Sequence, residues 1–263
     1  MSGEFETIRL EVDGRGVARL VLNRPEKHNV LNAVMIDELT LAARRLGVDA
    51  SVRAVVLSGE GKSFCAGGDL TWMKAQLDAT RPQRMDQAGR LAGMLKALDE
   101  MPKLLIAVVQ GAAYGGGVGM VAISDIAIGA DDCMFALTET KLGLIPATIS
   151  PFVFRRIGAA NLRRFALNSR LFDAATAQAI GLLSETAPGA ACCDAVNVHV
   201  EAALACAPEA IADAKRLFRG LALGGVSTED TIAALADRWE SSEARHGIES
   251  FLARQKSRWL SQE

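Results

Sequence analysis

Short apolar runs and alternating segments divide the first half of the chain into strand-like and helix-like stretches. Residues 7–22 alternate apolar and polar side chains on both sides of residues 13–16 (DGRG), which predicts a β-hairpin with a glycine-containing turn. Residues 53–57 (RAVVL) and 104–109 (LLIAVV) are nearly continuous apolar runs, as expected of strands that are covered on both faces. A further short strand is expected at 126–129.

Helical spacing separates these strands. Asn32 is suited to cap a helix N terminus, and apolar residues around and after it recur at intervals of three and four. These apolar positions are Leu31, Val34, Met35, Leu39, Ala42 and Leu46. Amphipathic helix is also expected within 70–100, after a looser segment around Arg81-Pro82, and a short helix is expected at 116–124. Strands that alternate with helices predict an α/β fold.

Beyond Pro151 the chain shows helical patterns and no strand pattern. The expected helices cover residues 159–167, 173–180, 194–206, 209–219, 228–240 and 244–259. Asp173 is a candidate cap for the second of them, and Ser227 with Asp230 forms a candidate capping box for the fifth. We therefore divide the chain into a core at 1–195, which holds the active site, and a C-terminal helical region at 196–263 of the same functional unit.

Composition and charge narrow the function classes. The chain has 263 residues, of which 50% are hydrophobic, and a net charge of −2, so it can bury a large core and has no global attraction to nucleic acid or anionic membranes. The first twelve residues lack the basic and apolar regions of a secretory signal, and no apolar run reaches the length of about 18 residues that a membrane span needs. We expect a soluble, cytoplasmic protein that binds neither nucleic acid nor membrane.

Cysteine and histidine do not form a metal-binding pattern. The five cysteines include no CxxC pair, and the three histidines lie far apart in the sequence. We therefore expect no metal site and no disulfide framework.

Two glycine-rich loops are the first candidates for chemistry. CAGGD at 65–69 and GGG at 115–117 each lie between an expected strand and an expected helix. If the loops converge, their backbone N–H groups can polarise one carbonyl oxygen, with the dipole of the helix that begins near Gly116 adding to the effect. The alternative is that these glycines only permit turns or close packing. Tyr114, beside the second loop, lines a pocket or fills the core.

Glu139 is the candidate acid. Apolar neighbours in FALTETKLGLIP predict a desolvated carboxyl with a raised pKa, although Thr138, Thr140 and Lys141 are equally compatible with an exposed loop. Glu139 could also bind a ribose if residues 117–122 formed a dinucleotide fingerprint, but these glycines do not directly follow the strand, as that motif requires.

Several longer motifs together resemble those of the crotonase, or enoyl-CoA hydratase/isomerase, superfamily. They are NRPEKHNVLN at 23–32, RAVVLSGEGKSFCAGGDL at 53–70, residues 109–144 around the triple glycine, and GIESFLARQK at 247–256. The resemblance implies a repeated ββα core with a C-terminal helical trimerisation region, and a homotrimer or a hexamer built as a dimer of trimers. It also implies an acyl-CoA thioester as substrate, in which coenzyme A is part of the substrate and no separate cofactor is needed.

The resemblance also assigns roles to residues. The amides of Gly68 and Gly116 would form an oxyanion hole for the thioester oxygen, and Glu139 would act as acid/base. The implied substrate and CoA contacts are Ala66, Asp69, Leu70, Thr71, Lys27 and Tyr114, together with the position of Gly119.

Gly119 departs from the pattern of typical hydratases, which have a glutamate there and a second one at the position of Glu139. A single acid/base would suit a Δ3,Δ2-enoyl-CoA isomerase, in which one carboxyl moves a proton between two carbons. The sequence of residues 69–74, 113–119 and 135–153 is most similar to that of bacterial methylglutaconyl-CoA hydratases of leucine breakdown. We therefore expect hydration of 3-methylglutaconyl-CoA.

Two further alternatives concern other uses of the same fold. Aromatic dehalogenation would need a nucleophilic aspartate after the position of Glu139, and residues 140–153 contain no acidic residue. A non-catalytic binding protein of this fold is the alternative of another class. Candidate partners for a distal carboxylate on the substrate are Lys74, Lys141 and Arg155.

Overall fold

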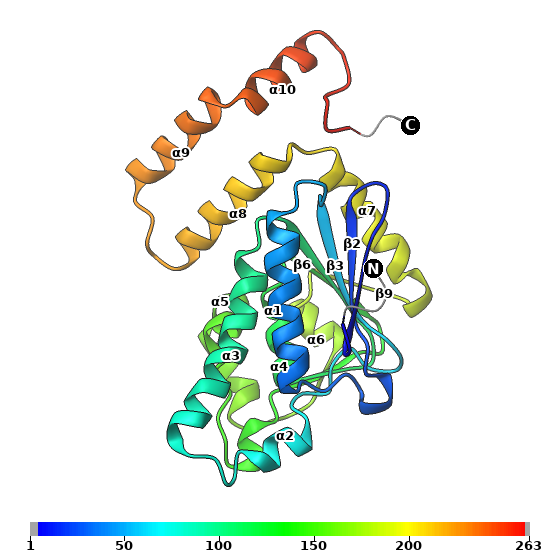
Figure 1. The fold of residues 1–263 in the computed structure, drawn as a ribbon, viewed down its shortest axis with the longest axis vertical. Coiled ribbons are helices and arrows are strands. Elements are labelled where there is room, and N and C mark those ends of the chain that lie inside the picture. Colours follow the sequence, from blue (N-terminus) through cyan, green and yellow to red (C-terminus); the bar gives the residue numbers. More distant parts are fainter. Residues whose placement is uncertain (1–4, 261–263) are drawn as a thin grey trace.

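A six-stranded sheet forms the centre of the computed structural model, which describes residues 5–260 (Figure 1). Its strands, in spatial order, are β1 (Ile8–Val12), β2 (Val17–Leu22), β3 (Ala54–Gly59), β4 (Leu104–Val109), β6 (Ile126–Ala130) and β9 (Glu185–Ala187). The first two strands form the antiparallel hairpin expected from the alternation, and the other neighbours pair in parallel. A smaller sheet contains β5 (Ala112–Tyr114), β7 (Met134–Ala136) and β8 (Phe172–Asp173).

Helices cover both faces of the main sheet, which explains its apolar central strands. The helices are α1 (Ala33–Val48), α2 (Leu70–Ala75), α3 (Arg81–Glu100), α4 (Gly116–Ala122), α5 (Ser150–Ala166), α6 (Ala174–Ala179), α7 (Cys192–Leu204), α8 (Pro208–Ala222), α9 (Thr228–Glu240) and α10 (Ser242–Leu252). In β4, Leu105 and Ala107 join the larger core with α1, α3 and α4, whereas Ile106 packs with α7 on the opposite face. The prediction of strands buried on both faces is confirmed.

The predicted helix caps are confirmed. Asn32 Oδ1 accepts a hydrogen bond from the Met35 amide at 2.9 Å, and the predicted caps at Asp173 and Ser227 are formed as well. The predicted apolar stripe of α1 is wrong at two positions. Leu31 lies before the helix, and Val34 is exposed and not part of the buried stripe.

The prediction of no strands beyond Pro151 is also wrong, because β8 and β9 lie there. Both are only two or three residues long, which is too short to show an alternation, and β9 is a strand because β6 offers it an edge to pair with. The segment 70–100 forms two helices, and Arg81-Pro82 begins α3 because proline is favoured in a first helical turn. The last helix ends at Leu252 rather than at 259.

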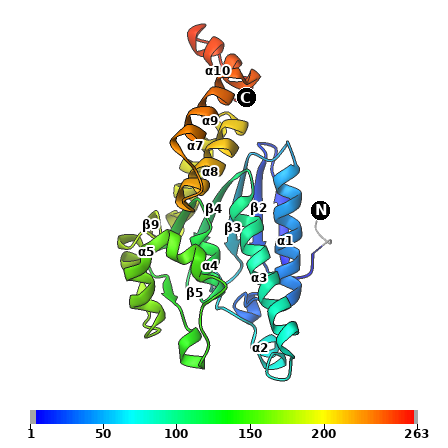
Figure 2. The ribbon, with the colours of Figure 1, turned by 90° about the vertical axis from the view of Figure 1, so that its left-hand side faces the viewer.

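Helices α8–α10 extend from the core as an arm (Figure 2). The expected boundary between residues 195 and 196 falls within α7, which packs on the main sheet through Val196 and Val200. Within the described residues, no single helix is long and apolar enough to cross a membrane. The two helical segments at 189–204 and 208–222 are long and apolar enough only when they are counted together, and they are bent by 106° relative to each other.

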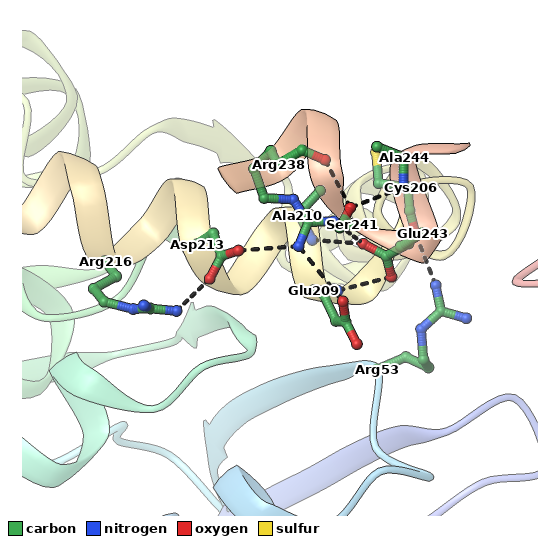
Figure 3. A network of polar contacts seen from close by, with 10 residues as sticks. All are labelled: Arg53, Cys206, Glu209, Ala210, Asp213, Arg216, Arg238, Ser241, Glu243 and Ala244. Atoms are coloured by element: carbon green, nitrogen blue, oxygen red, sulfur yellow. Dashed lines mark hydrogen bonds and ion pairs between the residues drawn. The ribbon is translucent and has the colours of Figure 1, made fainter. Parts of the chain in front are cut away.

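A buried glutamate holds the arm together (Figure 3). The Glu243 side chain is 4% exposed, pairs with Arg238 at 2.6 Å, and accepts the amides of Glu209 and Ala210 at the start of α8. Arg53 at the sheet donates to the carbonyl of Cys206, just before α8. One carboxylate therefore caps α8 and joins it to α9 and α10.

Replacing this carboxylate is expected to loosen the arm. Glu243→Ala leaves the α8 amides and the Arg238 guanidinium without their partner, and we expect a loss of about 3 kcal/mol in the free energy of unfolding. Glu249→Ala is the matched control, since Glu249 lies in an exposed pair with Arg245 on the same helix. Chemical denaturation measures both, and equal stability of the two variants would contradict this role for Glu243.

Candidate active site

The two glycine loops lie side by side at the carboxyl ends of β3 and β4, the edge where parallel sheets commonly bind ligands. The Cys65 amide donates to the Ala112 carbonyl at 3.1 Å, and the Cys65 carbonyl accepts from the Tyr114 amide at 2.9 Å. A side chain at Gly117 would come within 2.5 Å of the Cys65 carbonyl oxygen, so a glycine is required there for close packing. The two loops therefore converge, which is the condition for their amides to act on one oxygen.

The Gly68 amide is free and held in a fixed direction. The Leu31 amide donates to the Gly67 carbonyl at 2.8 Å, and the Leu31 carbonyl accepts from the Asp69 amide at 2.8 Å. All described peptide bonds are trans, so the Gly68 N–H points opposite to the carbonyl of Gly67 in the same peptide plane, away from Leu31. In the part of the chain that the structure describes, this N–H donates to no other group.

The direction of the Gly116 N–H is also fixed by a hydrogen bond to the carbonyl of its own peptide. Gly115 is the N-cap residue of α4, and its carbonyl accepts from the Gly119 amide at 3.1 Å. The Gly116 N–H of that peptide therefore points out of the helix N terminus, and among the described residues it has no acceptor. Leu31 lies against both glycines: it bridges Gly68, and its Cδ1 would lie 2.6 Å from a Cβ at Gly116.

Glu139 lies next to this helix N terminus. It begins a short 3-10 helix (Glu139–Leu142) after β7, and its Oε1 would be 2.9 Å from a Cβ at Gly115, so a glycine leaves the space that the carboxyl occupies. Its Oε2 is buried and has no hydrogen-bond partner among residues 5–260. Burial raises the pKa of the Glu139 carboxyl above that of an ordinary glutamate. The desolvated carboxyl that we expected is found. The exposed-loop alternative is wrong for Thr138 and Thr140, which are half-buried, and right for Lys141, which is exposed.

The position of Gly119 is closed to a second carboxylate. A Cβ there would lie 2.8 Å from Cγ2 and 3.2 Å from Cβ of Ile149, which is 2% exposed, and 3.6 Å from Leu95. A glutamate would fit only if Ile149 moved. Two aliphatic side chains therefore occupy the place of the missing acid.

Asp69 does not present a free carboxylate to a ligand. Its Oδ1 accepts the amides of Thr71 at 2.8 Å and Trp72 at 3.3 Å, and its Oδ2 pairs with Arg24 at 2.9 Å. Burial by itself raises the pKa of Asp69, but the hydrogen bonds from Arg24 and the two amides outweigh it and hold the pKa below that of an ordinary aspartate.

The other expected contacts lie around the first glycine loop. Ala66 donates its amide to the His28 carbonyl at 3.0 Å, which places the neighbouring, exposed Lys27 beside this loop. Leu70 and Thr71 are exposed at the start of α2. Tyr114 is half-buried in β5.

The three candidate cations for a distal carboxylate differ in availability. Arg155 is paired with buried Asp99, so its guanidinium is already engaged. Lys74 in α2 and Lys141 in the Glu139 segment are exposed. Arg155 is therefore the weakest of the three candidates.

Competing chemistries do not fit this site. Burial raises the pKa of Cys65 to about 12, so its thiol is not an activated nucleophile. A dinucleotide site at α4 does not fit for two reasons. Its pyrophosphate would lie against the Glu139 carboxyl, and β5 lies between β4 and the glycines that should follow that strand directly. Within the described residues, no group of three or more His, Cys, Asp or Glu side chains could hold a metal ion.

Sequence reasoning missed three residues that shape the site. In the sequence, Leu31 is one position of a helical stripe and Ile149 is one apolar residue among many. Arg24 is only one residue of the NRPEKHNVLN motif. The NRPEKHNVLN motif contained two of them, but a single sequence does not show that their partners lie in the 65–72 loop.

Comparisons with known proteins identify similar sequences and similar structures. The family described as enoyl-CoA hydratase/isomerase matches residues 13–262. Enoyl-CoA hydratase ACTT6 of Alternaria alternata is 32% identical over 255 residues, covering 88% of this chain and 84% of that protein. An enoyl-CoA hydratase structure from Shewanella pealeana superposes with a TM-score of 0.93 at 33% identity, covering 97% of each chain. AtuE of Pseudomonas aeruginosa gives a TM-score of 0.93 at 35% identity, covering 97% of this chain and all of that one. The expected crotonase-type α/β fold is confirmed.

The burial of Glu139 predicts a stability effect that depends on pH. The folded-state pKa is raised, so the ionised carboxyl destabilises the fold at neutral pH. This penalty decreases as the pH falls through the folded-state pKa and is absent below the lower pKa of the unfolded chain. Glu139→Gln is therefore expected to raise the Tm at pH 7.5, by about 2–4 °C per kcal/mol, and to raise it less near pH 4. Calorimetry at both pH values, with exposed Glu240→Gln as the control, measures this. A variant less stable than wild type at pH 7.5 would show that the carboxylate is stabilised by its surroundings.

Proposed function

This chain belongs to the enoyl-CoA hydratase/isomerase family, and we propose that it adds water to an enoyl-CoA with Glu139 as its only acid/base. The observation that carries this proposal is the carboxyl of Glu139 beside Gly115, at the N terminus of α4. Within residues 5–260, one of its oxygens is buried without a hydrogen-bond partner, and the nearby Gly116 amide has no acceptor. Such a group has the raised pKa and the open hydrogen-bonding capacity that proton transfer needs.

The amides of Gly68 and Gly116 are assigned to the thioester oxygen. Attack on an enoyl thioester moves negative charge onto that oxygen, and donors already aimed at it need no reorganisation when the charge develops. Both N–H groups have fixed directions because the carbonyls of their own peptides are already hydrogen-bonded. Each such donor is worth roughly 100- to 1,000-fold in rate.

Glu139 performs both proton transfers in this mechanism. Its carboxylate takes a proton from water as the water oxygen bonds to C3, and the electron pair of the C2–C3 double bond moves into the enolate. The same carboxyl then returns the proton to C2, so that water is added overall and Glu139 regains its starting state. A raised pKa brings proton donation and acceptance closer in free energy.

The acyl group that we propose is 3-methylglutaconyl. The support is the similarity of residues 69–74, 113–119 and 135–153 to bacterial methylglutaconyl-CoA hydratases. Lys74 and Lys141 are the exposed cations available for its distal carboxylate. Ala66, Leu70, Thr71 and Lys27 are assigned to the CoA arm, which is part of the substrate.

A Δ3,Δ2-enoyl-CoA isomerase is the second candidate function. The observation in its favour is the aliphatic packing of Ile149 and Leu95 at Gly119, which leaves no second acid to bind the attacking water. In that reaction Glu139 would carry a proton from one carbon to another, without a net gain of water.

We also propose that the arm associates with other copies of this chain in a trimer or a hexamer. The support is a set of large apolar side chains on α8–α10 that are 39–81% exposed in one chain. They are Phe218, Leu221, Ile232, Leu235, Trp239, Ile248, Phe251 and Leu252. Light scattering of the full chain tests this, and a monomeric mass would contradict it.

Turnover of three thioesters separates the candidates. The protein is incubated with 3-methylglutaconyl-CoA, crotonyl-CoA and a 3-enoyl-CoA, and mass spectrometry detects the gain of 18 Da that one water adds. We expect hydration to be fastest with 3-methylglutaconyl-CoA, and Glu139→Gln to lower it by about 100-fold or more. In the wild type, kcat/KM should fall on the acid side with a pKa above that of an ordinary glutamate.

The same assay defines the contrary results. Double-bond migration without water gain would establish the isomerase instead. Near-normal turnover by Glu139→Gln would remove Glu139 from the mechanism, and CoA binding without conversion of any acyl chain would favour the non-catalytic binding protein. Glu60→Gln, an exposed carboxyl paired with Arg9, is the control for the loss of one negative charge.

A further inference from the structure

Arg24 and Asp69 form a largely buried ion pair directly behind Gly68. Arg24 Nη2 lies 2.9 Å from Asp69 Oδ2, and the two side chains are 16% and 12% exposed. The other oxygen of Asp69 caps α2 by accepting the amides of Thr71 and Trp72. One carboxylate therefore ties the residue after Gly68 both to a helix and to a cation.

The second guanidinium nitrogen and the backbone of Arg24 are hydrogen-bonded within the turn at residues 24–31. Arg24 Nη1 donates to the Val30 carbonyl at 2.7 Å. The Arg24 amide donates to Asn29 Oδ1 at 2.8 Å, and the Asn29 amide donates back to the Arg24 carbonyl at 2.9 Å. Arg24 is thus anchored at both its backbone and its side chain.

This turn leads into the bridge that sets the direction of the Gly68 amide. Leu31, the residue after Val30, donates to the Gly67 carbonyl and accepts from the Asp69 amide, each at 2.8 Å. The guanidinium of Arg24 bonds one residue on each side of this bridge, Val30 and Asp69. It therefore fixes how the two segments lie relative to each other.

We propose that Arg24 is a positioning residue for the oxyanion hole, acting through Asp69 and Val30 to aim the Gly68 amide. The inference rests on the proposed function, in which that amide binds the thioester oxygen. A displaced donor weakens binding of the enolate-like transition state more than binding of the neutral thioester. Loss of Arg24 therefore lowers kcat more than it changes KM.

Arg24→Met tests this role, because methionine retains an unbranched apolar stem and removes the charge and every donor. We expect kcat per folded active site to fall by about 10- to 100-fold, with little change in KM. Arg24→Lys should recover part of the loss, since one ammonium keeps the charge but not the planar fork that reaches Val30 and Asp69 together. Arg9→Met removes an arginine from an exposed pair and should keep wild-type kcat.

A double-mutant cycle separates positioning from a general structural role. Asp69→Asn keeps an oxygen that can cap α2 and removes the negative charge opposite Arg24. If both residues act through one contact, the double variant is no slower than the slower single variant. Two defects that multiply independently would overturn the proposal. A lower Tm with unchanged kcat per folded site would do the same, because Arg24 would then serve stability alone.

Acetoacetyl-CoA supplies a measurement that does not depend on turnover. This β-ketothioester ionises to an enolate that absorbs in the near ultraviolet, and an oxyanion hole increases the enolate fraction. We expect the band to rise on binding to the wild type and to be weaker with Arg24→Met. If hydration fails and the band still depends on Arg24, the positioning role stands without the proposed reaction. If wild type and Arg24→Met give equal enolate bands, the positioning role of Arg24 is wrong. If the wild type gives no enolate band, both the positioning role and the proposed oxyanion hole are wrong.

Discussion

The site depends on two peptide carbonyls that are already hydrogen-bonded. The Leu31 amide holds the carbonyl of Gly67, and the Gly119 amide holds the carbonyl of Gly115. Because each peptide is planar and trans, fixing its carbonyl also fixes the direction of the following N–H, which belongs to Gly68 or Gly116. The strand ends, the β5 segment and the start of α4 bring these two peptides together. In the proposed mechanism, the electrostatic stabilisation therefore comes from backbone N–H groups and not from side chains.

Glu139 adds a carboxyl to this backbone arrangement, and we expect its burial to lower the stability of the fold at neutral pH. Its carboxyl takes the space that Gly115 leaves open, and one of its oxygens is buried without a partner in the described chain. An unpaired buried carboxyl disfavours its own ionised form, which raises its pKa and suits it to exchange protons. Ile149 closes the neighbouring position, so the proposed reaction has Glu139 as its single acid.

Much of this arrangement could be predicted from the sequence, but not all of it. The long strands, the caps at Asn32 and Ser227 and the order of loops and helices follow from local patterns of five or more residues. Strands β5, β7, β8 and β9 could not be predicted in this way, because two or three residues show no period and their pairing depends on distant partners. The same limit applies to side chains. The carboxyl of Asp69 is paired with Arg24, and the space beside Gly119 is filled by Ile149. Each of these two contacts joins segments that are far apart in sequence.

The most direct test of the central claim is a crystal structure of this protein with a bound saturated acyl-CoA, which has no double bond to hydrate. The account predicts that the thioester oxygen lies about 2.7–3.1 Å from the amide nitrogens of both Gly68 and Gly116. It also predicts that C2 and C3 of the acyl chain face the carboxyl of Glu139. A thioester oxygen held by other donors, or a Glu139 carboxyl turned away from those carbons, would contradict the account.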